Sequence, residues 1–167
     1  MKVYSLSLKR QMKDCILAVV WPKRDIFRLF YECSVPVRTL SLIENWDAKG
    51  LSRAAMVERV FDGLQKQPDN GTMHFDLLLD VLSNWTEFDS HWFVDQQMLN
   101  ADKARAKVAA LRQARTVNVD QAKQLAEQRR IRAEAQNQRF ESIEEMRQDF
   151  YQVSLSSASP QKRGLAF

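Results

Sequence analysis

Glycine and proline are scarce in this sequence, with four residues of each type among 167. Antiparallel sandwiches and barrels need many tight turns, in which these two residues are favoured. The apolar residues instead recur at steps of three and four, which is the spacing of one face of a helix. We therefore predict an all-α protein.

Cysteine and long apolar runs are also nearly absent. Cys15 and Cys33 are the only cysteines, and both stand within apolar segments. Thiols in such segments are typically buried and free, which favours a reducing compartment. No apolar run approaches the roughly 18 residues of a bilayer span, and Pro22-Lys23-Arg24 follows the run 15–21 in place of a small-residue cleavage site. We expect a cytoplasmic protein without membrane contact.

The sequence also lacks the usual signals of chemistry. It has no glycine-rich phosphate loop and no nucleophile elbow. His74 and His91 are the only histidines, and neither has a cysteine or an acidic pair at metal-ligand spacing. We predict no catalytic centre, no metal site and no cofactor.

Residues 1–89 are predicted to form a small helical bundle, the head. Ser34 and Ser52 are expected to cap two helices, and Pro22 and Pro36 to stand in the first turns of their helices. Five helices are expected over residues 6–21, 22–32, 36–46, 53–67 and 72–85. Their predicted core-facing residues are Leu8, Met12, Cys15, Ile16, Val19, Ile26, Leu29, Phe30, Leu40, Ile43, Trp46, Met56, Val57, Val60, Phe61, Leu64, Phe75, Leu78, Leu79, Leu82 and Trp85.

Residues 90–155 are predicted to form a long helical arm. A helix capped by Asp89 or Ser90 is expected over 91–115, and a second helix over 119–153. The segment 116–120, Thr-Val-Asn-Val-Asp, favours helix poorly. It therefore predicts an antiparallel hairpin, with a single bent helix as the alternative. The first helix has a heptad-like apolar stripe, typical of a coiled coil, formed by Val94, Met98, Ala101, Ala104, Val108 and Leu111.

The net charge of +4 belongs to the residues from 91 onward, where 13 Lys and Arg stand against 9 Asp and Glu. On a helical wheel of residues 119–153, Arg129, Arg132 and Arg139 share one face with apolar residues, and glutamates occupy the opposite face. Two interpretations remain open. The arginines either keep a long helix solvated, or they contact an anionic partner such as carboxylates or DNA phosphates.

The end of the chain predicts a linker over Ser154 to Pro160, followed by Gln161-Lys162-Arg163-Gly164-Leu165-Ala166-Phe167. Residues 156–167 are thus expected to be a linker and the start of a domain that is missing here. This ending, together with the head segment from Trp21-Pro22-Lys23-Arg24-Asp25-Ile26 through Lys49-Gly50-Leu51-Ser52-Arg53 to Trp85, resembles prokaryotic restriction-endonuclease-like proteins. In that family a helical head and a coiled-coil arm precede a nuclease domain of the PD-(D/E)xK type.

The resemblance implies a non-catalytic regulatory, targeting or oligomerisation region of an anti-phage defence protein that acts on DNA. DNA contact would come mainly through the missing nuclease domain. The alternative is a stand-alone helical adaptor that binds a partner protein through its arm. Self-association through the arm is expected under the first hypothesis, and Arg129, Arg132 and Arg139 are the candidate contacts to an anionic partner.

Overall fold

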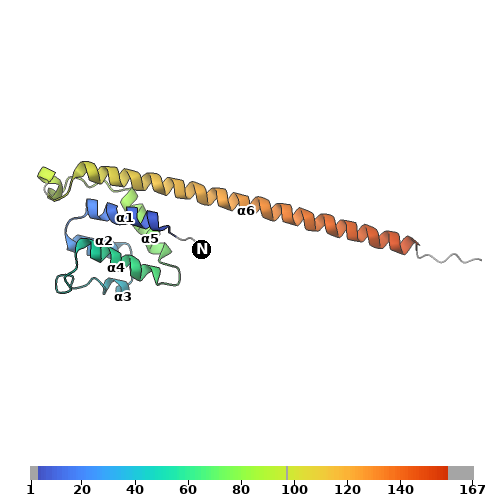
Figure 1. The fold of residues 1–167 in the computed structure, drawn as a ribbon, viewed down its shortest axis with the longest axis horizontal. Coiled ribbons are helices and arrows are strands. Elements are labelled where there is room, and N and C mark those ends of the chain that lie inside the picture. The colour runs from blue at the N-terminus through green and yellow to red at the C-terminus, as the bar shows by residue number, and fades with distance from the viewer. Residues whose placement is uncertain (1–3, 97, 158–167) are drawn as a thin grey trace, which may run out of the picture. The chain divides into compact units, whose positions relative to one another are not determined.

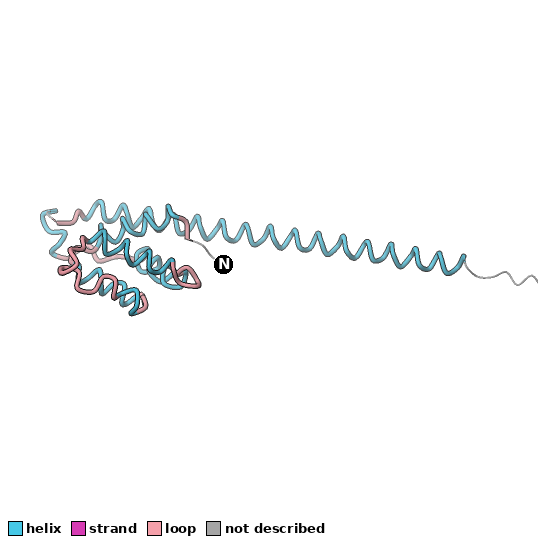
Figure 2. The backbone as a smooth tube through the Cα atoms, turned by 60° about the horizontal axis from the view of Figure 1, so that its bottom comes forward, coloured by secondary structure: helices cyan, strands magenta, loops and turns pink. Residues whose placement is uncertain are grey.

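The fold is seen in a computed structural model that describes residues 4–96 and 98–157. Within these ranges the chain forms α-helices and one short 3-10 helix, and no strand (Figures 1 and 2). The predicted all-α class is confirmed. The elements are α1 (Leu6–Val19), α2 (Lys23–Glu32), α3 (Val37–Leu40), α4 (Arg53–Gln65), α5 (Thr72–Ser83), η1 (His91–Gln96) and α6 (Ala101–Ser157).

The chain divides into two units, Met1–Asn118 and Val119–Phe167. Helix α6 therefore contributes its first turns to the first unit and its remainder to the second. The first unit, which we call the head, ends later than the boundary predicted between residues 89 and 90. The reason is that Ala104, Val108 and Leu111 of α6 are buried in its core.

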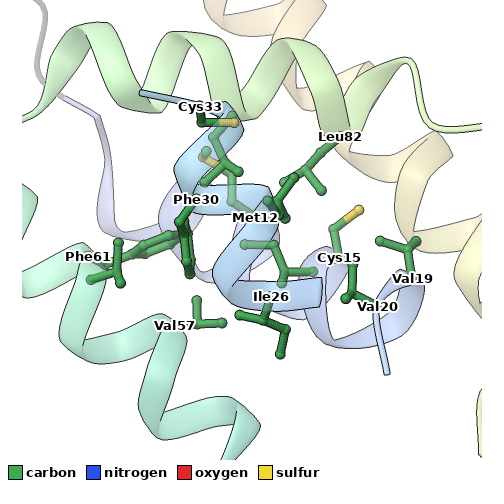
Figure 3. Close-up of a cluster of buried hydrophobic side chains, with 14 of the residues drawn as sticks. Met12, Cys15, Val19, Val20, Ile26, Phe30, Cys33, Val57, Phe61 and Leu82 are labelled. Carbon is green, nitrogen blue, oxygen red and sulfur yellow. The ribbon is translucent and has the colours of Figure 1, made fainter. Parts of the chain in front are cut away.

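The core of the head is built from the apolar faces that helical spacing predicts. All the predicted core-facing residues of α1, α2 and α4 are buried, as are Phe75, Leu78, Leu79 and Leu82 of α5. Figure 3 shows part of this cluster around Met12, Ile26 and Phe30. Phe61 packs edge-on against Phe75, with the ring centroids 5.1 Å apart. Burying a large apolar side chain contributes about 1.5–3 kcal/mol, so this cluster dominates the stability of the head.

Side chains and glycine define several helix starts. Ser52 caps α4 as predicted, since its hydroxyl accepts a hydrogen bond of 3.1 Å from the Ala55 amide. Ser5 caps α1 in the same way. Pro22 is the N-cap of α2 and so lies one position before the predicted first turn. Gly71 caps α5 in the left-handed conformation, with φ at 69°.

The third predicted helix, over residues 36–46, is mostly wrong. Only Val37–Leu40 is α-helical, and the following residues form hydrogen-bonded turns up to Gly50. Asn45 has a φ of 55°, which a continuing right-handed helix does not permit. The prediction that Ser34 caps this helix is also wrong, because Ser34 is left-handed and its amide closes the end of α2 on the Tyr31 carbonyl.

The start of the predicted arm differs as well. Residues His91–Gln96 form the 3-10 helix η1 instead of the first turns of a long helix. Helix α6 begins at Ala101, and the Asn100 carboxamide oxygen accepts a 2.9 Å hydrogen bond from the Lys103 amide. Asn100 is therefore the cap, in place of Asp89 or Ser90. Val94 and Met98, predicted on the apolar stripe, lie before α6 and are exposed.

The predicted break at residues 116–120 does not occur, and the predicted hairpin is therefore wrong. Helix α6 runs without interruption from Ala101 to Ser157. The Thr116 hydroxyl donates to the Arg112 carbonyl and the Asn118 amide to the Ala114 carbonyl, so both polar groups bond to their own helix. Thr, Val and Asn each cost at most about 0.7 kcal/mol relative to Ala, which their helix-favouring neighbours offset.

Polar contacts attach the first turns of α6 to the head. The Arg112 guanidinium donates to the Ser83 carbonyl at 2.9 Å, and Arg115 pairs with Asp80 at 2.8 Å. Both partners lie on α5, so these bonds hold α6 against that helix. At its other end α6 continues to Ser157, so the linker prediction is wrong for residues 154–157, which are helical. The remainder of that linker, residues 158–160, and the predicted start of a further domain lie outside the described residues.

Both cysteines are buried and free, as predicted. Burial raises the pKa of the Cys15 thiol to about 12 and that of the Cys33 thiol to about 11. Nearby Asp14 and Glu32 also raise these two pKa values, whereas Lys107 lowers that of Cys15. Both thiols are thus protonated near neutral pH and are poor nucleophiles.

Gly71 and Gly50 allow a matched test of the packing between α4 and α5. Both are left-handed, but a Cβ on Gly71 would lie 2.7 Å from the Leu64 Cβ, whereas a Cβ on Gly50 would meet nothing within 4 Å. Gly50→Ala should cost only the conformational penalty, about 1 kcal/mol of unfolding free energy. Gly71→Ala should cost about 2–4 kcal/mol, because strain and a steric clash add. Urea denaturation measures both, and equal losses would contradict the described contact.

Candidate interaction surface on the C-terminal segment of α6

The C-terminal segment of α6, residues 119–157, has apolar side chains without cover. Every residue in this range is exposed. Several large side chains keep more than half of their surface accessible, among them Ile143 at 56%, Met146 at 64% and Phe150 at 73%. Large apolar side chains exposed in a regular series of this kind mark an interaction surface.

These apolar residues belong to one regular series along α6, which we call the seam. Its positions alternate in steps of three and four, the heptad pattern of a helix that pairs with another helix. In the C-terminal segment the seam consists of Ala122, Leu125, Arg129, Arg132, Gln136, Arg139, Ile143, Met146, Phe150 and Val153. A strict seven-residue repeat drifts by about 20° per heptad on a straight helix. It stays on one side only when two helices coil around each other, so the repeat itself favours a helical partner.

The same series starts in the head, where it has a partner. Ala101, Ala104, Val108 and Leu111 continue the alternation in the N-terminal direction. The last three are at most 3% exposed. The head thus buries the first two heptads of the pattern, and the C-terminal segment presents the later ones to solvent.

Three arginines occupy the middle of the exposed seam. They are Arg129, Arg132 and Arg139, the residues predicted to contact an anionic partner. Within the described part of the chain none of them forms an ion pair, whereas Arg130 pairs with Glu127 at 2.8 Å and Arg147 with Glu144 at 3.8 Å. The structure therefore places the three arginines together on the seam with free guanidinium groups. Their partner stays a prediction.

Charge is separated along the C-terminal segment. Residues 121–139 contain five Lys and Arg and two Glu, a net charge of +3. Residues 140–157 contain one Arg and four Asp and Glu, a net charge of −3. With Asp120 the whole segment is at −1. It is therefore not a basic surface overall but a helix with one positive and one negative half.

Sequence reasoning missed part of this surface. Met146 and Val153 lie off the apolar face on a straight helical wheel of residues 119–153, because a seven-residue repeat drifts by about 20° per heptad on such a wheel. The uninterrupted series of three-and-four steps from Ala101 to Val153 was the available signal.

Metal ligation and membrane insertion add nothing to this surface within the described residues. No three His, Cys, Asp or Glu side chains in residues 4–96 and 98–157 are grouped so that they could hold a metal ion. None of the helices in these ranges combines the length and the apolar content that crossing a bilayer requires. The surface is suited to binding through apolar contact and charge.

Comparisons with known proteins found no similar protein. No protein-family model matches the sequence, no curated protein matches it, and no solved structure matches its fold.

Proposed function

We propose that this chain is a non-catalytic dimerisation module in which the C-terminal segment of α6 pairs, antiparallel, with the same segment of a second copy. The observation that supports it most directly is the exposed seam on a helix with halves of opposite charge. Two such helices in opposite directions place each positive half, 121–139, beside a negative half, 140–157. The pair then buries both apolar strips.

The heptad positions specify the register of such a pair. Antiparallel coiled coils match the first apolar position of one heptad with the second of the other helix. Charge overlap is greatest when Arg139 lies opposite Ile143 of the second copy and Arg132 opposite Phe150. In this register Arg129 faces Val153, and Gln136 faces Met146. Each arginine then lays its aliphatic stem on an apolar residue and directs its charged end towards acidic residues such as Asp149.

The parallel arrangement is disfavoured by the same residues. It would place Arg129, Arg132 and Arg139 each against its own copy, with three layers of like charge in the seam. An exposed ion pair contributes only about 0.2–1 kcal/mol, so the charges alone do not hold the dimer together. We therefore assign the affinity mainly to the apolar residues and the orientation to the charges.

Disulfide trapping tests the orientation. The variants Gln136→Cys and Met146→Cys are prepared separately, and native Cys15 and Cys33 do not compete because they are buried. Antiparallel pairing predicts rapid cross-linking in the mixture of the two variants and little in either variant alone. Identical positions would then be ten residues apart along the axis, or about 15 Å. Non-reducing gel electrophoresis after mild oxidation measures the product.

Two outcomes would contradict this arrangement. Efficient cross-linking of each variant with itself would indicate a parallel pair. A monomeric mass by light scattering across the accessible concentration range, with no cross-linking, would remove self-association. The seam would then bind a helix of a different protein, as the adaptor hypothesis states.

The arginine row is tested by charge removal. The triple variant Arg129→Gln, Arg132→Gln, Arg139→Gln should keep its helix content, since Gln favours helix nearly as well as Arg. Its dimer Kd should rise about three- to tenfold at low salt and less at high salt, because the lost interactions are screened. Arg130→Gln is the matched control, since Arg130 lies off the seam and pairs within its own helix. An unchanged Kd in the triple variant would mean that the row only solvates the helix.

The resemblance to restriction-endonuclease-like proteins would add a role on DNA to this proposal. No matching family, curated protein or solved structure supports that addition. Under it, the paired segments would bring together two heads and position nuclease domains on DNA in the cytoplasm. We do not assign DNA contact to the arginine row. The C-terminal segment has a net charge of −1, and Glu127, Glu134 and Glu141 occupy the face opposite the row.

A gel-shift titration checks this assignment. DNA binding depends on cationic contacts to phosphate and weakens steeply with salt. We expect the full chain and the triple Arg→Gln variant to retain a short duplex to the same small extent at low salt. If the native chain retained the duplex and the triple variant did not, the arginine row would instead be assigned to phosphate binding.

A further inference from the structure

A cleft in the head brings together three of the four tryptophans of the chain. It has a volume of about 520 Å³ and lies entirely within the first unit. Its lining includes Trp21, Trp85 and Trp92, together with Asp25, Arg28, Glu32 and Glu87. A volume of this size accommodates more than one side chain of a ligand.

The tryptophans come from three separate parts of the chain. Trp21 lies between α1 and α2, Trp85 follows α5, and Trp92 belongs to η1. All three are only half-buried. The Trp85 indole N–H donates to the Glu87 carbonyl at 3.0 Å, and the Trp92 ring lies against the His91 ring, tilted by 41° with the centroids 3.8 Å apart. These contacts hold two of the indoles in place while part of each ring borders the cleft.

The charges around the cleft are mainly negative. Asp25, Glu32 and Glu87 supply three carboxylates, against the single guanidinium of Arg28. Asp25 lies 3.6 Å from Arg24, whereas Glu32, Glu87 and Arg28 form no ion pair within residues 4–96 and 98–157. Two of the three carboxylates are therefore available to a ligand. This excess of negative charge disfavours phosphate and carboxylate ligands and favours a cation.

Aromatic faces combined with carboxylates are the chemistry that recognises an organic cation. The head contains an internal example, since the Arg53 guanidinium lies over the Trp21 ring, 4.5 Å from its centroid, and so already occupies one face of that indole. We propose that the cleft binds a cationic side chain, arginine or lysine, from a basic segment of a partner polypeptide. This site lies on the head and does not depend on pairing through α6.

Nuclear magnetic resonance provides a direct test, because each indole N–H gives its own signal. The full chain, labelled with ¹⁵N, is titrated with acetyl-Gly-Arg-Gly-amide and with the lysine peptide. The citrulline peptide has nearly the same shape as the arginine peptide without its charge. The two cationic peptides should shift the signals of Trp21, Trp85 and Trp92. The citrulline peptide should bind about tenfold more weakly, because both the cation–aromatic and the ion-pair contributions are lost.

Trp46 is the internal control. It packs against Phe27 and does not line the cleft, so its signal should stay in place. The double variant Glu32→Gln, Glu87→Gln should weaken the arginine peptide about five- to tenfold, since two exposed carboxylates are neutralised. Both side chains are exposed, so the fold should tolerate the change. Glu44→Gln, exposed and away from the cleft, should have no effect.

Several results would overturn the proposal. Equal binding of the arginine and citrulline peptides would show that charge is not recognised. A shift of Trp46 as large as that of the other three would show that binding is not at the cleft. Movement of the three signals with protein concentration alone would place a second copy of this chain in the cleft instead of a partner polypeptide.

Discussion

The structure depends on the burial of one apolar strip, the seam of α6, which has a partner over only part of its length. Ala104, Val108 and Leu111 are buried in the head beside α1 and α5, and ion pairs such as Arg115 with Asp80 hold this part of the helix. Beyond Asn118 the same pattern continues on a fully exposed helix. Apolar surface exposed in this regular form has a free-energy cost that pairing removes. The proposed dimer follows from that imbalance.

The head and the C-terminal segment of α6 use charge differently. In the segment, the two halves carry net charges of +3 and −3, which under the proposed dimerisation would select an antiparallel pair in which no arginine of the row faces another. In the head, the cleft combines indole rings with an excess of carboxylates. In the proposed function the first surface is complementary to itself, and in the further inference the second is complementary to a basic segment. Under these two proposals, the chain would join other polypeptides through both surfaces.

Prediction from sequence succeeded where the local pattern and the tertiary contacts agree. The faces of α1, α2 and α4 were correct because amphipathic spacing decides which side of a short helix is buried. Prediction failed where the low helix propensity of a few residues was taken to end a helix that its neighbours continue. Thr116 and Asn118 disfavour helix, but their side chains bond back to the helix and α6 continues. It also failed at residues 41–50. The apolar residues there follow a helical spacing, but this segment forms successive turns, and Ile43 is buried without a helix.

The sequence by itself determined the helical class, the core of the head, the free thiols and the arginine row, because each depends on residue type and on spacing within about two turns. Only the tertiary structure decided that α6 is continuous, that its first heptads belong to the head, and that three distant tryptophans line one cleft. The physical reason is that these features depend on which surfaces are buried by residues far away in the chain. Periodicity shows that a face must be covered, whereas the folded chain decides what covers it.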